Sequence, residues 1–228
     1  MDPQKFKGKT IANIIASFSR LEWRCIEGES STEIPLGKIT LVQYDTVKPV
    51  KQSDYLFRVK PNLVLAESLR QSEGKSLGLA SIVAHEGQTY HIPMLDLDAH
   101  GKFDFFDDAQ LLDMYKTTIK RETEIEQGLF LRSGPSRNYH FLGIGRLLTQ
   151  DQYVTFLGLA LTMKYEIGDN AINLADSRNI GHCLTRFAHK AELGKFPSRY
   201  CQFERFSTMR ITPKQGYGGP PVVVDFIA

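Results

Sequence analysis

Strand-like and helix-like patterns follow one another along this chain without the regular alternation of strand, helix and strand that builds a parallel sheet. Residues 77–84 and 89–97 are apolar segments on either side of a turn, which predicts a hairpin. Asp107 or Asp108 is placed to cap a helix, and residues 149–165 have the pattern of a second, buried helix. This mixture predicts the α+β class.

The chain has 228 residues, of which 28 are basic and 26 acidic. That length fits one domain, which can bury about 70% of its extended surface without disulfides. The three cysteines form no CxxC pair, which argues against a disulfide framework and a zinc ribbon. The longest nearly unbroken apolar stretch, 154–163, is about half a membrane span, and the first residues lack a signal-peptide core. We therefore expect a cytoplasmic protein without a membrane partner.

Charge is distributed unevenly, although the net charge is only +2. Residues 96–126 contain nine carboxylates and four basic side chains, whereas residues 177–214 contain eight basic side chains and two carboxylates. An acidic segment followed by a basic one suits an enzyme that holds metal ions beside a polyanion. Two ordinary solvated surfaces of opposite sign would give the same distribution.

A pair of aspartates, Asp96 and Asp98, ends the apolar segment 92–95, and the chain then breaks near Gly101. Residues i and i+2 of a strand point to one face, so both carboxylates should leave the sheet on the same side. Adjacent carboxylates repel each other unless a cation lies between them, and oxygen ligands of this kind suit Mg²⁺ or Mn²⁺ that phosphates also hold. An ordinary turn at the end of a strand is the alternative.

A small polar loop, 133–137, separates two strand-like segments further along the chain. Backbone N–H groups in such a Gly/Ser loop can bind anions, and Ser and Arg side chains add donors. His140 follows among apolar neighbours, where it could serve the same loop or be a buried core histidine. Beyond these, an apolar strand ends at Asp176, which is placed either to cap the next helix or to be a third metal ligand.

The order of these three motifs resembles the archaeo-eukaryotic primase superfamily, also called the primase-polymerases, over residues 89–200. The second and third motifs look most like the small bacterial primase-like branch. The resemblance implies an RRM-like palm with an additional N-terminal α/β unit. We expect one catalytic domain over 1–228, with an N-terminal unit of uncertain assignment (1–88), a motif-bearing core (89–212) and a C-terminal turn and strand (213–228).

The resemblance also assigns roles to residues. Three aspartates would be catalytic and would bind two Mg²⁺ or Mn²⁺ ions: Asp96, Asp98 and Asp176. Four residues would bind the incoming triphosphate: Ser133, Ser136, Arg137 and His140. The family usually places a serine two to six residues before the histidine. Ser136 lies four residues before His140 and Ser133 lies seven, so which serine binds phosphate is open.

The basic segment 178–214 would lie along the backbone of a nucleic acid, and its interleaved aromatic residues, Phe206 among them, would offer stacking surfaces. Its main contacts would come from five residues: Arg178, Arg186, Lys190, Lys195 and Arg199. The alternative is that the aromatic side chains belong to the core and the charges form a solvated rim.

These roles predict a metal-dependent, template-directed nucleotidyltransferase, a primase or a DNA or RNA polymerase, that adds nucleotides to a 3′-hydroxyl. Its partners would be nucleoside triphosphates, single-stranded or primed nucleic acid, and a helicase or other replication or defence protein encoded separately. One alternative is a primase-like module that binds nucleic acid or nucleotides without synthesis. Another is a metal-dependent glycosyltransferase, but that fold expects a nucleotide-binding βαβ region before the Asp-x-Asp pair, which the sequence does not clearly show.

Overall fold

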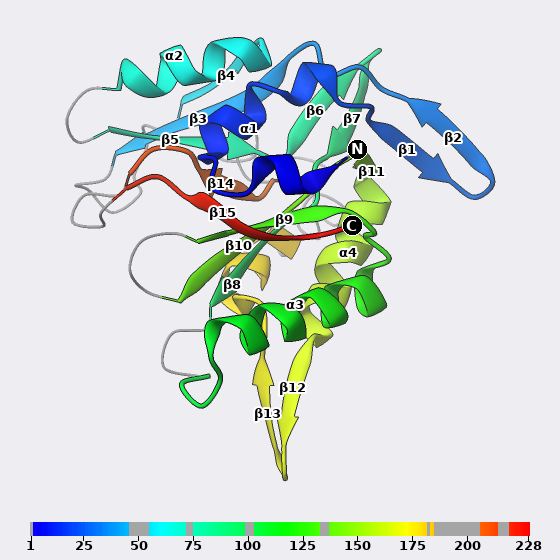
Figure 1. Cartoon of the computed structure of the whole chain (residues 1–228). Helices are drawn as coiled ribbons and strands as arrows, with labels where there is room; N and C mark the ends of the chain where they lie inside the picture. The colour runs from blue at the N-terminus through cyan, green and yellow to red at the C-terminus, as the bar shows by residue number, and fades with distance from the viewer. Residues whose placement is uncertain are drawn as a thin grey trace.

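The computed structural model describes residues 2–45, 55–71, 75–98, 103–132, 137–181, 183–184, 206–213 and 219–228. Strands in these ranges gather into several sheets with few helices, so the expected α+β class is confirmed (Figure 1). None of the helices in these ranges is both long and apolar enough to cross a membrane.

The sheet that carries the motifs, here called the motif sheet, has four antiparallel strands in the order β15-β9-β10-β8. Its strands are β8 (Met94–Asp98), β9 (Gly128–Arg132), β10 (Asn138–Gly143) and β15 (Val222–Ile227). A second antiparallel sheet, here called the facing sheet, has the order β14-β5-β3-β4. Its strands are β3 (Ile39–Asp45), β4 (Tyr55–Val59), β5 (Lys75–Ala80) and β14 (Thr208–Arg210).

A third sheet, of order β2-β1-β11-β7-β6, flanks these two and contains one parallel pair, β1 with β11. Its strands are β1 (Arg24–Glu27), β2 (Ser30–Glu33), β6 (Ile82–His85), β7 (Gln88–His91) and β11 (Arg146–Thr149). Two further strands, β12 (Lys164–Ile167) and β13 (Asn170–Asn173), form a hairpin that projects from the body (Figure 1).

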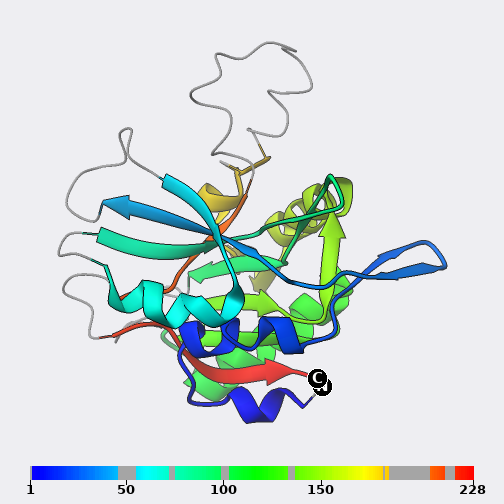
Figure 2. The ribbon, with the colours of Figure 1, turned by 90° about the horizontal axis from the view of Figure 1, so that it is seen from above.

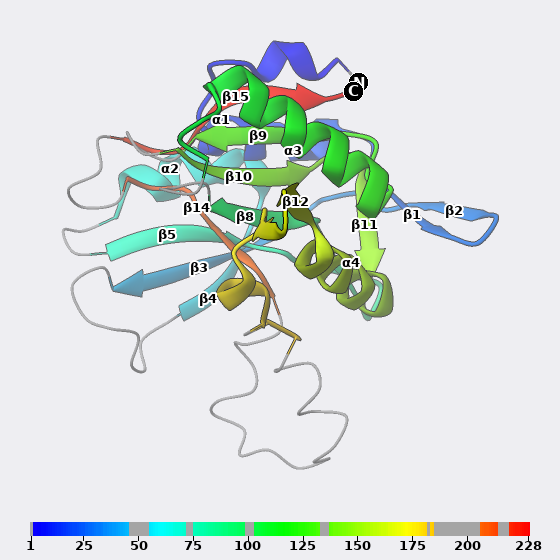
Figure 3. The ribbon, with the colours of Figure 1, turned by 90° about the horizontal axis from the view of Figure 1, so that it is seen from below.

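The longer helices, α3 (Asp108–Thr123) and α4 (Gln150–Thr162), lie on the side of the motif sheet away from the facing sheet (Figure 3). Shorter helical segments cluster near the facing sheet and β15 (Figure 2). They are η1 (Pro3–Phe6), α1 (Ile11–Ile15), η2 (Phe18–Arg20), η3 (Pro61–Leu63) and α2 (Val64–Leu69).

Strand alternation divides the motif sheet between two hydrophobic cores. Met94 and Leu142 pack into the core between the two sheets, together with residues of the facing sheet. Leu95 and Tyr139, on the opposite face, pack into the core under α3 and α4. The motif sheet therefore contributes side chains to a hydrophobic core on each of its faces.

The expected hairpin is confirmed at its turn, where Glu86 and Gly87 both have positive φ between β6 and β7. It is shorter than expected, because the chain leaves it at each side for another sheet. β5 belongs to the facing sheet and β8 to the motif sheet, so the 77–97 region joins all three sheets.

A buried polar network ties the end of the third sheet to α4 and to the start of β14. The ring of His91 stacks on Tyr153 with centroids 4.3 Å apart, and its Nδ1 lies 3.3 Å from the hydroxyl of Ser81. The hydroxyl of Tyr153 donates to Ser207 Oγ (2.6 Å). Burial lowers the pKa of His91 to about 4 and raises that of Tyr153 to about 12, so both side chains are neutral in the folded protein at pH 7.

Because His91 is buried and neutral, we expect the free energy of unfolding to fall in acid. The unfolded chain takes up a proton on His91 near pH 6.5, whereas the folded protein does so only near pH 4, so this stability is complete above about pH 6.5 and falls as the pH falls toward 4. At pH 5 the loss should be about 2 kcal/mol. Urea unfolding at pH 8 and pH 5 should show this loss in the wild type and in the control His85→Gln, but not in His91→Gln. An equal loss in all three proteins would contradict it.

Candidate functional site

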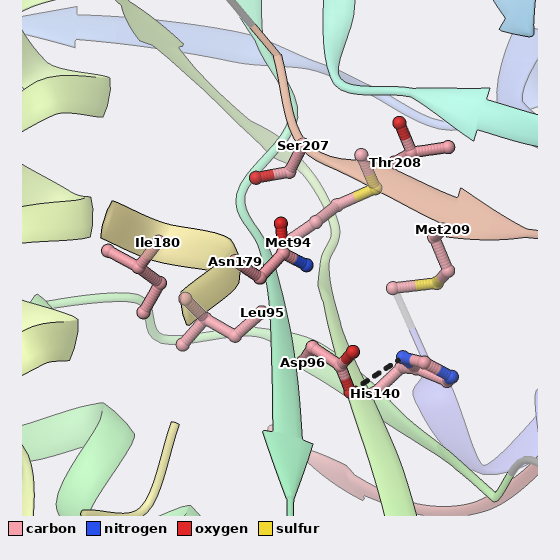
Figure 4. A pocket seen from close by; sticks show the side chains of 9 residues that line it. All are labelled: Met94, Leu95, Asp96, His140, Asn179, Ile180, Ser207, Thr208 and Met209. Carbon is pink, nitrogen blue, oxygen red and sulfur yellow. Dashed lines mark ion pairs between the residues drawn. The ribbon is translucent and has the colours of Figure 1, made fainter. Parts of the chain in front are cut away.

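The motif sheet brings Asp96 and His140 together from two neighbouring strands. The register of β8 and β10 places the two residues directly opposite each other. His140 Nδ1 lies 3.4 Å from Asp96 Oδ1, and the two side chains are 14% and 34% exposed. Leu95 and Leu97 point into the core under the helices, so Asp96 belongs to the opposite face, toward the facing sheet (Figure 4).

The electrostatic environment keeps the His140 ring neutral. Burial lowers the pKa of His140, Asp96 raises it, and the charge of Arg210 lowers it again, with a net result below the usual value. The contact at 3.4 Å therefore joins a neutral imidazole ring to the Asp96 carboxylate. Additional negative charge beside this ring would raise its pKa.

Asp176 lies beside Asp96 although the two are far apart in the sequence. The backbone N–H of Asp176 donates to the carbonyl oxygen of Asp96 (2.8 Å), along the edge of β8 that does not pair with β10. Its carboxylate also caps the helical turn that follows, because Oδ1 accepts from the backbone N–H of Arg178 (2.9 Å). Asp176 therefore has one of its two expected roles, the helix cap, and its backbone lies beside that of Asp96.

The side chain of Arg178 folds back onto the same carboxylate. Its Nε lies 3.2 Å from Asp176 Oδ1 and its Nη2 lies 3.3 Å from Oδ2. Burial raises the pKa of the Asp176 carboxyl, but hydrogen bonds from Arg178 and its positive charge lower it by more, so the net pKa is below the usual value. Asp176 is therefore ionised and paired with Arg178.

A pocket opens above Asp96 and His140, between β8, the turn after Asp176 and the start of β14 (Figure 4). Two methionines and several small polar side chains share its wall with the charged pair. The lining residues are Met94, Leu95, Asp96, His140, Asn179, Ile180, Ser207, Thr208 and Met209.

Arg137 is directed toward the first turn of α3. Its Nε lies 2.8 Å from Asp108 Oδ1, and its Nη1 donates to the carbonyl of Phe103 (3.1 Å). Arg132 contacts the other oxygen of Asp108 at 2.9 Å. These contacts hold the two strands that flank the 133–136 loop against α3 and do not bring Arg137 to Asp96.

Several expected site residues lie outside the described ranges: Ser133, Ser136, Arg186, Lys190, Lys195 and Arg199. Asp98 ends β8, and its backbone is in register with Asn138. Phe206 is buried, so its ring cannot stack on a nucleic-acid base, and this part of the expected stacking surface is wrong.

The donor chemistry of this region fits a hard divalent cation, since Asp96 and Asp176 supply carboxylate oxygens on neighbouring backbone segments. Within the described side chains, however, no three His, Cys, Asp or Glu residues are gathered closely enough to hold a metal ion. The Asp176 carboxylate is instead paired with Arg178.

Arg210 is a site residue that the sequence did not single out. It ends β14, which pairs with β5 of the facing sheet, and its charge acts on His140. The sequence places Arg210 in the basic segment, but the pairing of β14 with β5 is a contact between distant segments that periodicity does not predict. Met209, also on β14, joins the pocket wall for the same reason, and Asn179 joins it from the helical turn after Asp176.

A family model described as AEP-like, archaeo-eukaryotic primase 1D-like, matches residues 59–188, which is more than half of the chain. This region contains Asp96, His140 and Asp176, the three residues that the structure brings together. No curated protein and no solved structure matches the chain.

Proposed function

The chain belongs to the AEP-like family of the archaeo-eukaryotic primase superfamily, and from this we propose that it is a metal-dependent, template-directed nucleotidyltransferase. The observation that carries the proposal is the meeting of three separate sequence motifs at one pocket. Asp96 contacts His140 through its side chain and Asp176 through its backbone. Asp96 and His140 line this pocket, and Asn179 and Ile180, which follow Asp176, line it as well.

In this proposal Asp96, Asp98 and Asp176 hold two Mg²⁺ or Mn²⁺ ions. When bound, such ions would activate a primer 3′-hydroxyl and stabilise the negative charge on the triphosphate. The contribution of the chain itself is mostly positioning, since phosphoryl transfer of this kind needs little covalent chemistry from the protein.

We assign His140 to the triphosphate. A polyphosphate bound beside the ring adds negative charge, which raises the pKa of His140 toward protonation. The protonated ring would donate from one nitrogen to Asp96 and from the other to a phosphate oxygen. Arg210, whose charge already reaches His140, would add a second cationic contact.

Ser133 and Ser136 remain proposed triphosphate ligands, through the loop between β9 and β10. For Arg137, the contacts with Asp108 and Phe103 favour an indirect part in nucleotide binding, in which it fixes one end of this loop against α3.

We propose that the motif sheet, with α3 and α4 on one face, is the RRM-like palm, and that the facing sheet belongs to the additional α/β unit. β14 and β15 follow each other near the C-terminus, yet β14 completes the facing sheet and β15 completes the motif sheet. This interlacing supports the assignment of 1–228 as one catalytic domain.

The basic segment 178–214 should bind single-stranded nucleic acid mainly through phosphates. Each neutralised phosphate contributes about −0.7 to the slope of log affinity against log salt concentration. We expect a slope of about −3 for the wild type, reduced in magnitude by about 0.7 in Arg186→Ala or Lys190→Ala. Fluorescence anisotropy with a labelled oligonucleotide measures this slope, and a wild-type slope near zero would remove nucleic acid from the proposal.

A second candidate is a primase-like module that binds nucleic acid without synthesis. The pairing of the Asp176 carboxylate with Arg178 favours it, because a carboxylate held in this way need not bind metal. Extension of a labelled primer on a single-stranded template, with dNTPs or NTPs and Mg²⁺ or Mn²⁺, separates the two functions. The enzyme should extend the primer, and the module should only bind it.

A further inference from the structure

The contact between Arg178 and Asp176 combines a nearly buried acid with an exposed base. The Asp176 side chain is 16% exposed, and that of Arg178 is 79% exposed. Asp176 is held in place independently of this contact, because its backbone N–H donates to Asp96 and its backbone oxygen accepts from Ile180 at the start of the helical turn. The guanidinium can therefore leave the carboxylate without moving it.

The guanidinium occupies the oxygens that a cation would need. Oδ1 accepts both from the backbone N–H and from Nε of Arg178, and Oδ2 accepts from Nη2. A carboxylate oxygen has two lone pairs, so Oδ1 is saturated while Arg178 remains in place. A positive charge at this distance also repels a divalent ion.

We propose that Arg178 is an exchange residue, which neutralises Asp176 in the nucleotide-free protein and transfers to a phosphate oxygen of the nucleotide when a divalent ion takes its place. This inference rests on the proposed function and specifies how its site is assembled. The exchange requires little energy, because an ion pair with an exposed partner contributes little to stability. A guanidinium also binds phosphate in the same two-pronged geometry as carboxylate.

The exchange couples metal binding to polyphosphate binding, so that each strengthens the other. A metal ion at Asp176 releases Arg178 for the phosphate, and a phosphate that holds Arg178 leaves the Asp176 carboxylate open to the metal ion. Arg178 directly precedes Asn179 and Ile180, which form part of the pocket wall. Arg178 would thereby reach a phosphate of a nucleotide that lies over Asp96.

The test is Mn²⁺ affinity, measured by titration calorimetry without nucleotide. Arg178→Gln should bind Mn²⁺ about tenfold more tightly than the wild type, because a competing donor and a repelling charge are both removed. The same variant should show a higher KM for nucleotide, since the phosphate contact is lost. Arg178→Lys keeps the positive charge but loses the two-pronged geometry of the guanidinium. Its Mn²⁺ affinity should lie between those of the wild type and Arg178→Gln.

The matched control is Arg70→Gln, which removes an exposed arginine paired with Glu67 at 3.1 Å on α2. It should leave Mn²⁺ affinity unchanged. Equal or weaker Mn²⁺ binding by Arg178→Gln, with clear binding by the wild type, would overturn the exchange role and leave the metal site standing. Absence of Mn²⁺ binding in the wild type and in both Arg178 variants would overturn the metal site and the exchange together.

Discussion

Asp96→Asn is expected to reduce nucleotide incorporation at least about a thousandfold, which corresponds to about 4 kcal/mol of lost transition-state stabilisation. The substitution keeps the shape of the side chain and an oxygen that can accept from His140, but it removes the charge that would hold the cations. The free energy of unfolding should change little, because the amide fits the same partly exposed position.

Incorporation rates under saturating nucleotide measure this effect, and urea unfolding checks the fold. Asp113→Asn is the matched control, since Asp113 is an exposed carboxylate on α3, outside the pocket. Incorporation by Asp96→Asn at the wild-type rate would show that Asp96 has no catalytic part.

His140→Ala should lower kcat/KM for nucleotide about a hundredfold, mainly through KM, and leave the affinity for single-stranded template within about twofold. The size of the effect follows from a charge-assisted contact to phosphate, worth about 1.5–3 kcal/mol. Because the ring is nearly buried beside Asp96, His140→Gln is a necessary second variant that fills more of the space. It should restore stability without restoring nucleotide affinity.

His85→Ala is the control for loss of an imidazole, because His85 lies on β6 in the third sheet. The two readouts separate a binding role from a structural one. If His140→Ala weakened nucleotide and template binding equally, and His140→Gln rescued both, His140 would be a core histidine that supports the sheet.

Local sequence patterns predicted the helices and strands better than the contacts between segments that are distant in the sequence. Asp107 is the cap of α3, one of the two residues that the sequence offered, and it forms a capping box with Gln110. Asp108 instead forms ion pairs with Arg132 on β9 and with Arg137 just before β10. Both arginines are distant from Asp108 in the sequence, so local patterns do not predict these contacts. The helix expected over 149–165 ends at Thr162, because the chain then enters the β12–β13 hairpin.

In the candidate site, too, the sequence predicted individual residues but not their contacts. The sequence predicted that Asp96, His140 and Asp176 matter, because each follows or interrupts an apolar strand pattern in a recognisable order. It could not predict that Arg178 would pair with Asp176, since an arginine side chain can reach many partners at similar cost. It also could not predict that the charge of Arg210 would act on His140, because that depends on the pairing of β14 with β5.

The central claim is that this chain transfers nucleotides to a primer under the direction of a template. The most direct test presents a labelled primer on four single-stranded templates that differ in the next base, with Mn²⁺ and one nucleotide at a time. We predict that the wild type adds the complementary nucleotide on each template and adds none when the metal is chelated. Tight, salt-dependent binding of the primed template without any addition, under every nucleotide and with either Mg²⁺ or Mn²⁺, would contradict the claim.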